Sequence, residues 1–108
     1  MDSIYLIITT VLKQEDAKKL ADLAIEKNMV GCVQIQSQCI SIYRWQGQIE
    51  TATEFPVHFK TNEANKQALM SLLKQNHPYD VPEIICIKAD EVESDYAEWL
   101  NAQISSKN

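Results

Sequence analysis

The stretch ISIYRWQGQIETATEFPVHFK, residues 40–60, decides the fold that we expect for this chain. Its first part is rich in β-branched and aromatic residues, its glycine suits a tight turn, and its second part alternates in polarity, so the pattern predicts a β-hairpin. In the returning strand one face holds Thr53, Phe55, Val57 and Phe59, and the other holds Glu54, Pro56, His58 and Lys60. Because proline cannot donate a ladder hydrogen bond, we expect Pro56 to face an unpaired edge or a bulge.

The residues before the hairpin predict a strand, a helix and the start of a second strand. Residues 4–10, IYLIITT, form a continuous apolar and β-branched run, which is typical of a central strand covered on both faces. From Ala17 onward the apolar residues recur with helical spacing over about three to four turns. Gly31 ends this helix, and residues 32–35 begin a strand that the polar residues 36–38 interrupt.

The residues after the hairpin predict a helix, a strand and a last helix. Asn62 is a good N-cap for the first of these helices. We expect this helix to end at residues 76–77, because the residue before a proline avoids helical backbone angles. Residues 83–87, EIICI, predict another strand, and Ser94 with Asp95 predicts the cap of the last helix.

The resulting element order, β-α-β-β-α-β followed by a helix, is that of the ferredoxin-like arrangement. We therefore predict an α+β fold in one domain over residues 1–108, with an antiparallel sheet, both main helices on one face and an extra C-terminal helix. Since the strands are apolar on both sides, we expect the open face of the sheet to be buried by the last helix or by other copies of the chain.

Composition and charge exclude several classes of protein. The 108 residues carry 10 Lys and Arg against 15 Asp and Glu, a formal net charge of −5, without a basic stripe. We therefore expect no nucleic-acid partner. The first apolar run is too short for a signal sequence or a membrane span, and three cysteines without CxxC spacing fit a reducing compartment. These features predict a cytoplasmic protein with no membrane partner and no structural zinc site.

Two motifs carry a resemblance to a known family. Residues 41–47, SIYRWQG, and residues 77–84, HPYDVPEI, closely resemble the CutA family, the divalent-cation tolerance proteins, and the likeness extends over nearly the whole chain. The resemblance implies a ferredoxin-like subunit in a tight homotrimer, in which long hairpin strands pair across subunits. It also implies a non-enzymatic role linked to copper tolerance and to the binding of divalent metal ions.

The chain departs from the family at positions that bind metal in some bacterial relatives. The resemblance places Thr9 where those relatives have a cysteine and Asn76 where they have the first histidine of a pair, so that only His77 is retained. We therefore expect no required cofactor, and at most weak binding of copper or another divalent cation through His77. Cys39 and His58 are also unusual for the family, and the sequence assigns neither of them a role.

The ligand-binding site that we expect is a charged cleft between subunits with aromatic walls. Its candidate residues are Cys32, Tyr43, Arg44, Trp45, Lys60, His77, Tyr79 and Glu83. Structural alternatives stay open for these residues. They are a small buried thiol for Cys32, a charge at a helix C-terminus for His77, and a salt bridge with aromatic packing for the cleft.

Three classes of function follow from these features. The first is a non-enzymatic homotrimer that takes part in the response to metal ions. The second is a signalling trimer similar to the PII proteins, which binds a small anionic effector through Lys60 and Arg44. The third, a hydrolase or redox enzyme, has little support, because the chain has no CxxC motif, phosphate-binding glycine loop, Ser-His-Asp order or paired-carboxylate motif.

Overall fold

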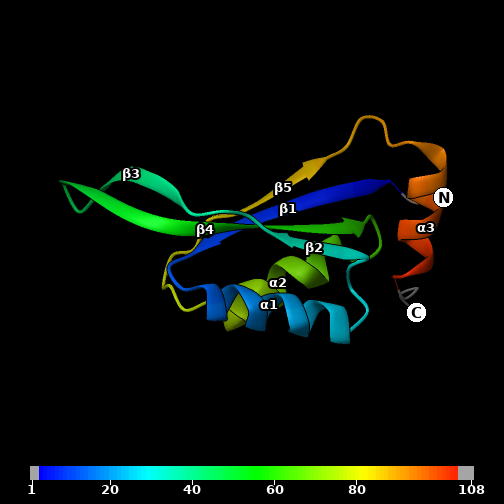
Figure 1. Ribbon diagram of the computed structural model, residues 1–108, viewed down its shortest axis with the longest axis horizontal. Coiled ribbons are helices and arrows are strands. Elements are labelled where there is room, and N and C mark those ends of the chain that lie inside the picture. The colour runs from blue at the N-terminus through cyan, green and yellow to red at the C-terminus, as the bar shows by residue number, and fades with distance from the viewer. Residues whose placement is uncertain (1–2, 105–108) are drawn as a thin grey trace.

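The computed structural model describes residues 3–104, in which two helices pack against one face of a five-stranded antiparallel sheet and a third helix lies at one end (Figure 1). In chain order the elements are β1 (Ile4–Val11), α1 (Gln14–Glu26), β2 (Cys32–Ile35), β3 (Cys39–Trp45), β4 (Gln48–Asn62), α2 (Lys66–Asn76), β5 (Ile84–Lys88) and α3 (Ser94–Ala102). The predicted α+β fold and element order are confirmed, and the polar residues 36–38 divide the second predicted strand into β2 and β3.

The sheet has the strand order β2-β4-β1-β5, and β3 pairs with the first half of β4. The strand β1 is central, as its continuous apolar run predicts, because β4 pairs along its whole length and β5 pairs on its other side. All of these pairings are antiparallel, which is the arrangement of a ferredoxin-like sheet.

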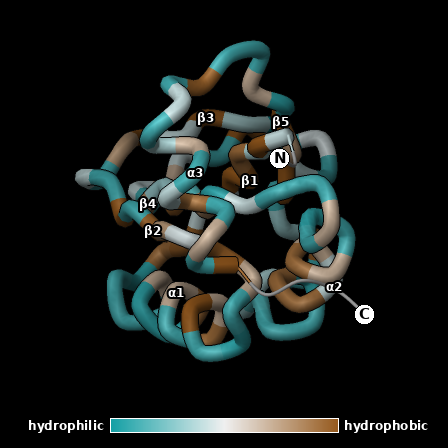
Figure 2. Tube along the Cα trace, turned by 90° about the vertical axis from the view of Figure 1, so that its right-hand side faces the viewer, coloured by the Kyte–Doolittle hydropathy of each residue, from teal (hydrophilic) through white to brown (hydrophobic). Residues whose placement is uncertain are grey.

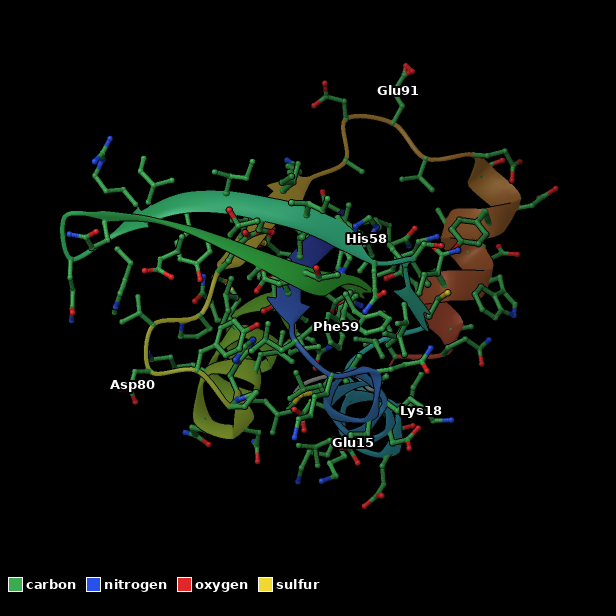
Figure 3. The ribbon with its side chains drawn as sticks, turned by 60° about the vertical axis from the view of Figure 1, so that its left-hand side comes forward. Glu15, Lys18, His58, Phe59, Asp80 and Glu91 are labelled. Carbon is green, nitrogen blue, oxygen red and sulfur yellow. The ribbon has the colours of Figure 1, made fainter. Side chains whose placement is uncertain are left out.

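The core lies between this sheet and the helices α1 and α2. Its fully buried side chains include Ile7, Val57, Phe59, Leu69 and Leu73, each with 0% of its surface exposed. Figure 2 shows α1 and α2 as a layer beneath the strands, with mostly hydrophilic residues along its outer edge. In Figure 3 the neighbouring β4 residues Phe59 and His58 point to opposite sides of the sheet, Phe59 toward the helices. The alternation predicted for the returning strand is therefore confirmed.

The hairpin of β3 and the first half of β4, residues 39–54, projects beyond the rest of the molecule, and we call it the arm (Figure 1). Its turn is made by Gln46 and Gly47, with φ angles of 50° and 81°, which are the left-handed values that favour glycine. The register places Cys39, Ser41, Tyr43 and Trp45 opposite Glu54, Ala52, Glu50 and Gln48. Since residues that pair across an antiparallel ladder share a face, these side chains form one face of the arm.

The other face of the arm carries three exposed isoleucines, and we call it the aliphatic face. It presents Ile40, Ile42 and Ile49, which have 71%, 70% and 63% of their surface accessible. Arg44 pairs with Ile49 and therefore belongs to this second face. The two faces of the arm thus differ: the first is polar and aromatic, and the second combines three isoleucines with Arg44 and two threonines.

Pro56 lies where the sequence predicted a break in pairing. In β4 it pairs with Thr10 of β1, and on its other side it faces residues 36–38, which interrupt β2 and β3. The Pro56 carbonyl accepts a hydrogen bond of 2.9 Å from the Gln36 N–H. The N–H that proline lacks would have pointed to this same side, where no regular ladder needs it.

Two predicted helix caps are wrong. Asn62 is the last residue of β4, and α2 has Asn65 as its N-cap, because the sheet continues to residue 62 and a turn follows it. Asn65 Nδ2 donates to Asn62 Oδ1 over 3.1 Å, so that Asn62 supports the turn instead of capping the helix. At α3 the cap is Glu93, whose carboxylate accepts the N–H groups of Asp95 and Tyr96, and Ser94 is already helical.

The face of the sheet opposite α1 and α2 is only partly covered. Leu100 and Ile104, from α3 and the residues after it, pack against Ile4 at one end of the sheet. Further along β5, Ile85 and Ile87 keep 47% of their surface exposed. The last helix therefore buries one end of the open face, and an apolar area remains beside it.

Candidate functional site

His77 lies at the junction of three segments of the chain. It follows α2 as the C-cap residue, with extended backbone angles of φ −73° and ψ 139°, as expected of a residue before proline. The side chain is buried, and its Nε2 atom is 3.0 Å from both Thr9 Oγ1 and the Thr10 carbonyl oxygen at the end of β1. These contacts attach the end of α2 to the central strand.

The second ring nitrogen of His77 is also occupied. The Tyr79 N–H donates to His77 Nδ1 over 3.1 Å, so Nδ1 carries a lone pair and Nε2 carries the hydrogen that the Thr10 carbonyl accepts. Burial lowers the pKa of His77 below its ordinary value of 6.5. The ring is therefore neutral, and both nitrogens serve the structure of the loop.

Tyr79 connects this loop to the arm. Its hydroxyl donates to Glu54 Oε2 over 2.7 Å, and its ring meets the His77 ring edge-on at a centroid distance of 4.7 Å. Burial raises the pKa of Tyr79 well above its usual value, and the bond to Glu54 adds to this effect. The hydroxyl consequently stays protonated and remains a donor to the carboxylate.

A cavity of about 630 Å³, which we call the arm pocket, lies where the arm meets the loop after α2. Six of its lining residues are chemically prominent: the acids Glu54, Asp80 and Glu83, and the aromatic residues Tyr43, Trp45 and Tyr79. The described lining contains no lysine, arginine or histidine. Asp80 lies on the loop in Figure 3, and Glu54 is the most deeply buried of the three acids.

Thr9 and Asn76, the two positions at which the sequence analysis expected the chain to lack metal ligands, both make structural hydrogen bonds. The Thr9 hydroxyl donates to the Glu83 carbonyl over 2.6 Å and so attaches β1 to the residue before β5. Asn76 Nδ2 donates to the Leu72 carbonyl of its own helix over 2.8 Å. Within residues 3–104 no group of three His, Cys, Asp or Glu side chains could hold a metal ion. The described side chains of one chain therefore do not fit a tight copper site.

The predicted cleft residues fall into two groups within one chain. Tyr43, Trp45, Tyr79 and Glu83 line the arm pocket, and His77 supports it through Tyr79. A second group lies at the other end of β4, where Lys60 Nζ is 3.1 Å from the Tyr96 hydroxyl.

Four further residues are not among the described lining of the arm pocket. Cys32 pairs with Lys60 in the sheet and packs beside α3. Arg44 is exposed on the aliphatic face of the arm. His58 lies on β4 between Ile8 and Gln34. Cys39 begins the arm, with its Sγ atom 3.8 Å from Ser41 Oγ.

Sequence reasoning missed Glu54, Asp80 and Thr10, which also line the arm pocket. Glu54 was placed correctly on the polar face of the returning strand, yet only 7% of it is exposed because the loop after α2 folds over it. The one available signal was Tyr79 beside the rigid Pro78, since a buried tyrosine hydroxyl requires a hydrogen-bond partner.

The fold and the projecting arm define the class of protein, a ferredoxin-like chain with an extended hairpin, and comparison with known proteins gives the family. A family model described as "CutA1 divalent ion tolerance protein" matches residues 5–103. The Divalent-cation tolerance protein CutA of Pectobacterium atrosepticum is 35% identical over 98 residues, which cover 91% of this chain and 89% of that protein. The chain belongs to the CutA1 divalent ion tolerance family.

Solved structures agree with this assignment. The crystal structure of CutA1 from Oryza sativa has a TM-score of 0.93 and 32% identity, with 98% of this chain and 97% of that chain covered. The structure of CutA from Synechococcus elongatus has a TM-score of 0.91 and 34% identity, with 97% and 93% covered. None of the helices described in residues 3–104 is long and apolar enough to cross a membrane.

Proposed function

We propose that this chain is a non-enzymatic, cytoplasmic protein of the response to divalent metal ions, copper among them, that residues 1–108 form one domain, and that it acts as a homotrimer. Membership of the CutA1 family supports the link to divalent ions. The observation that carries the proposed assembly is the aliphatic surface left on one chain, on the arm and on the open face of the sheet. Surfaces of this kind mark sites of protein association.

The assembly can be tested by light scattering. We expect a particle of about three times the 12.3 kDa of one chain, even at low micromolar concentration. A particle with the mass of one chain would contradict the proposal.

The metal-response proposal predicts weak copper binding that involves His77. A copper ion at Nδ1 must displace the Tyr79 N–H, and one at Nε2 must displace the hydrogen bonded to Thr10, so each position costs an existing bond. In a calorimetric titration with Cu(II), we expect a small heat of binding with low affinity, and we expect His77→Ala to abolish it. Tight binding that persists in His77→Ala and is lost only on replacing Cys32 or Cys39 would place the metal elsewhere.

The alternative, a signalling trimer similar to the PII proteins, requires cationic side chains around an anionic effector. Within one chain neither cation belongs to the described lining of the arm pocket, which is acidic: Arg44 is on the opposite face of the arm, and Lys60 is at the other end of β4. A site that uses both would therefore have to join residues of different subunits. Titration of the same protein with a small dicarboxylate such as succinate tests this alternative. Binding that Lys60→Gln or Arg44→Gln abolishes would favour it over the metal response.

A further inference from the structure

The end of the molecule opposite the arm carries a surface that combines a cation with aromatic rings, and we call it the α3 surface (Figure 1). Its members are Lys60 of β4 and Tyr96 and Trp99 of α3. The Lys60 ammonium group donates to the Tyr96 hydroxyl over 3.1 Å and lies 5.3 Å from the centre of the same ring. The two rings stack at a centroid distance of 5.8 Å, yet 37% of Tyr96 and 48% of Trp99 stay exposed. Among residues 3–104 no carboxylate forms an ion pair with Lys60.

The arm pocket has the complementary composition. Two of its lining acids, Asp80 and Glu83, are exposed, and within residues 3–104 neither carboxylate forms a hydrogen bond or an ion pair. Lys74 approaches this loop, but its ammonium group donates to the Asp80 carbonyl oxygen over 3.0 Å. The aromatic residues Tyr43 and Trp45 of the lining are 45% and 47% exposed. The pocket therefore offers acids and aromatic rings, and the α3 surface offers a cation and aromatic rings.

The two surfaces cannot meet within one chain. They lie at opposite ends of β4, and an extended strand from Glu54 to Lys60 spans about 20 Å. A second copy of the chain can bring them together. A threefold assembly needs a contact of this kind, because each of its interfaces joins two different surfaces of the chain, whereas a twofold interface joins one surface to itself.

We propose that in the homotrimer the α3 surface of each copy docks against the arm pocket of the next copy. The ammonium group of Lys60 then faces the exposed acids of the neighbouring pocket, and the aromatic rings of the two surfaces pack together. This proposal rests on the trimer proposed above and states which surfaces meet in it. The neighbouring copy covers the arm pocket and supplies the cation that the described lining lacks.

Both kinds of side chain suit such an interface. Tyrosine and tryptophan are enriched where proteins associate. Complementary charges determine which surfaces meet, and in which orientation, more than they determine how tightly the surfaces bind. We therefore expect the exposed isoleucines of the arm and of the sheet to supply most of the affinity, and the docked α3 surface to fix the arrangement of the copies.

The experiment is a charge exchange between the two surfaces. Lys60→Glu, Glu83→Lys and the double variant are compared by light scattering over a dilution series, at a fixed urea concentration that dissociates half of the parent assembly. We expect each single reversal to raise the dissociation constant about tenfold or more, because like charges then face each other. We expect the double variant to return to within about threefold of the parent, because the two changes are coupled. Recovery in the double variant also shows that the single variants had not simply failed to fold.

A matched control separates this contact from an effect of net charge. Lys60→Glu combined with Asp22→Lys has the same net charge as the exchange, but Asp22 is exposed on α1 and does not line the arm pocket. We expect this pair to assemble as weakly as Lys60→Glu alone. The proposal is wrong if Asp22→Lys restores assembly as well as Glu83→Lys does, or if the exchanged pair is no tighter than Lys60→Glu.

The result also distinguishes this docking from the trimer on which it rests. A parent protein with three times the mass of one chain, whose dissociation constant responds to none of the reversals, would overturn the docking and leave the proposed trimer standing. A parent protein with the mass of one chain would contradict both.

Discussion

Both ring nitrogens of His77 form hydrogen bonds, and these bonds connect β1 to the loop after α2. Its Nε2–H group holds the end of β1, and its Nδ1 atom holds the Tyr79 N–H, so the ring orients the residue that reaches Glu54. The ring must be neutral to do this, because a protonated Nδ1 cannot accept a hydrogen bond. The stability of the loop is thereby linked to pH.

The direction of this linkage can be predicted. In the unfolded chain His77 takes up a proton near pH 6.5, whereas in the folded chain burial lowers its pKa. As the pH falls below 6.5 the unfolded state therefore binds a proton that the folded state does not, and the free energy of unfolding decreases. The loss is at most about 1.4 kcal/mol per pH unit and ends once the pH passes the lowered pKa.

Urea denaturation at several pH values and one fixed protein concentration measures this effect. We expect stability to decline from about pH 7 toward about pH 5.5 in the parent protein, and the decline to be shallower in His77→Gln. An identical slope in the two proteins would show that His77 does not carry the linkage.

Gly31 is packed closely against Leu100 of α3, which leaves no room for a side chain at this position. A Cβ atom at this position would collide with Leu100 Cδ1 and come within 3.0 Å of the Leu100 carbonyl oxygen. Since the backbone of α3 cannot easily retreat, we expect Gly31→Ala to destabilise the protein by about 1–3 kcal/mol. Thermal unfolding compares it with Leu100→Ala and with the double variant. The two changes should be less than additive, because the smaller side chain at position 100 removes part of the collision.

At the scale of elements, the strands and helices could be predicted from sequence, but their ends could not. The apolar run of β1 and the alternation around Phe59 reflect burial, which leaves a periodic signal. The cap of α2 leaves no such signal, since Asn62 and Asn65 are equally good capping residues and only the length of β4 decides between them. Pro56 was interpreted correctly because its missing N–H restricts where it can lie.

The arm pocket could be predicted only in part, for a related reason. Tyr43, Trp45 and Tyr79 belong to motifs that can be recognised locally, but Glu54 becomes a pocket residue only when the loop after α2 folds over β4. That contact joins residues 25 positions apart in the chain, and neither segment encodes it alone. Strand alternation predicts the face on which Glu54 lies, whereas its burial depends on tertiary packing.

The hydrogen bond from Tyr79 to Glu54 connects the loop after α2 to the arm, and its contribution to stability can be tested. Among residues 3–104 the Tyr79 hydroxyl is the one hydrogen-bond donor to Glu54, and Tyr79→Phe removes it and leaves the buried carboxylate without that partner. We expect a loss of about 1–3 kcal/mol in the free energy of unfolding, measured by urea denaturation. The control is Tyr43→Phe, since Tyr43 is 45% exposed and a surface change of this kind costs no more than about 0.5 kcal/mol. Equal losses in both variants would contradict the assigned role of the Tyr79 hydroxyl.

At the scale of the whole molecule, the exposed apolar residues differ in what surrounds them. Ile25 lies on the outer side of α1, where charged residues are its neighbours in the helix, and Ile87 lies on the open face of the sheet beside other apolar side chains. Both are 47% exposed, so accessibility in one chain does not distinguish them. Only Ile87 belongs to a continuous apolar face, which is the kind of surface that a second copy of the chain would cover.

This difference provides a matched test of the proposed trimer. We expect Ile87→Lys to dissociate the assembly, because an unpaired charge in an apolar interface costs several kcal/mol and raises the dissociation constant by about 100-fold or more. Ile25→Lys adds the same charge at the same accessibility, and we expect it to leave the assembly intact. Light scattering at low micromolar concentration gives the mass of each variant, and circular dichroism checks that each is folded. If both variants keep the mass of the parent, the open face of the sheet is not an interface between copies, and the aliphatic face of the arm would have to carry the assembly alone.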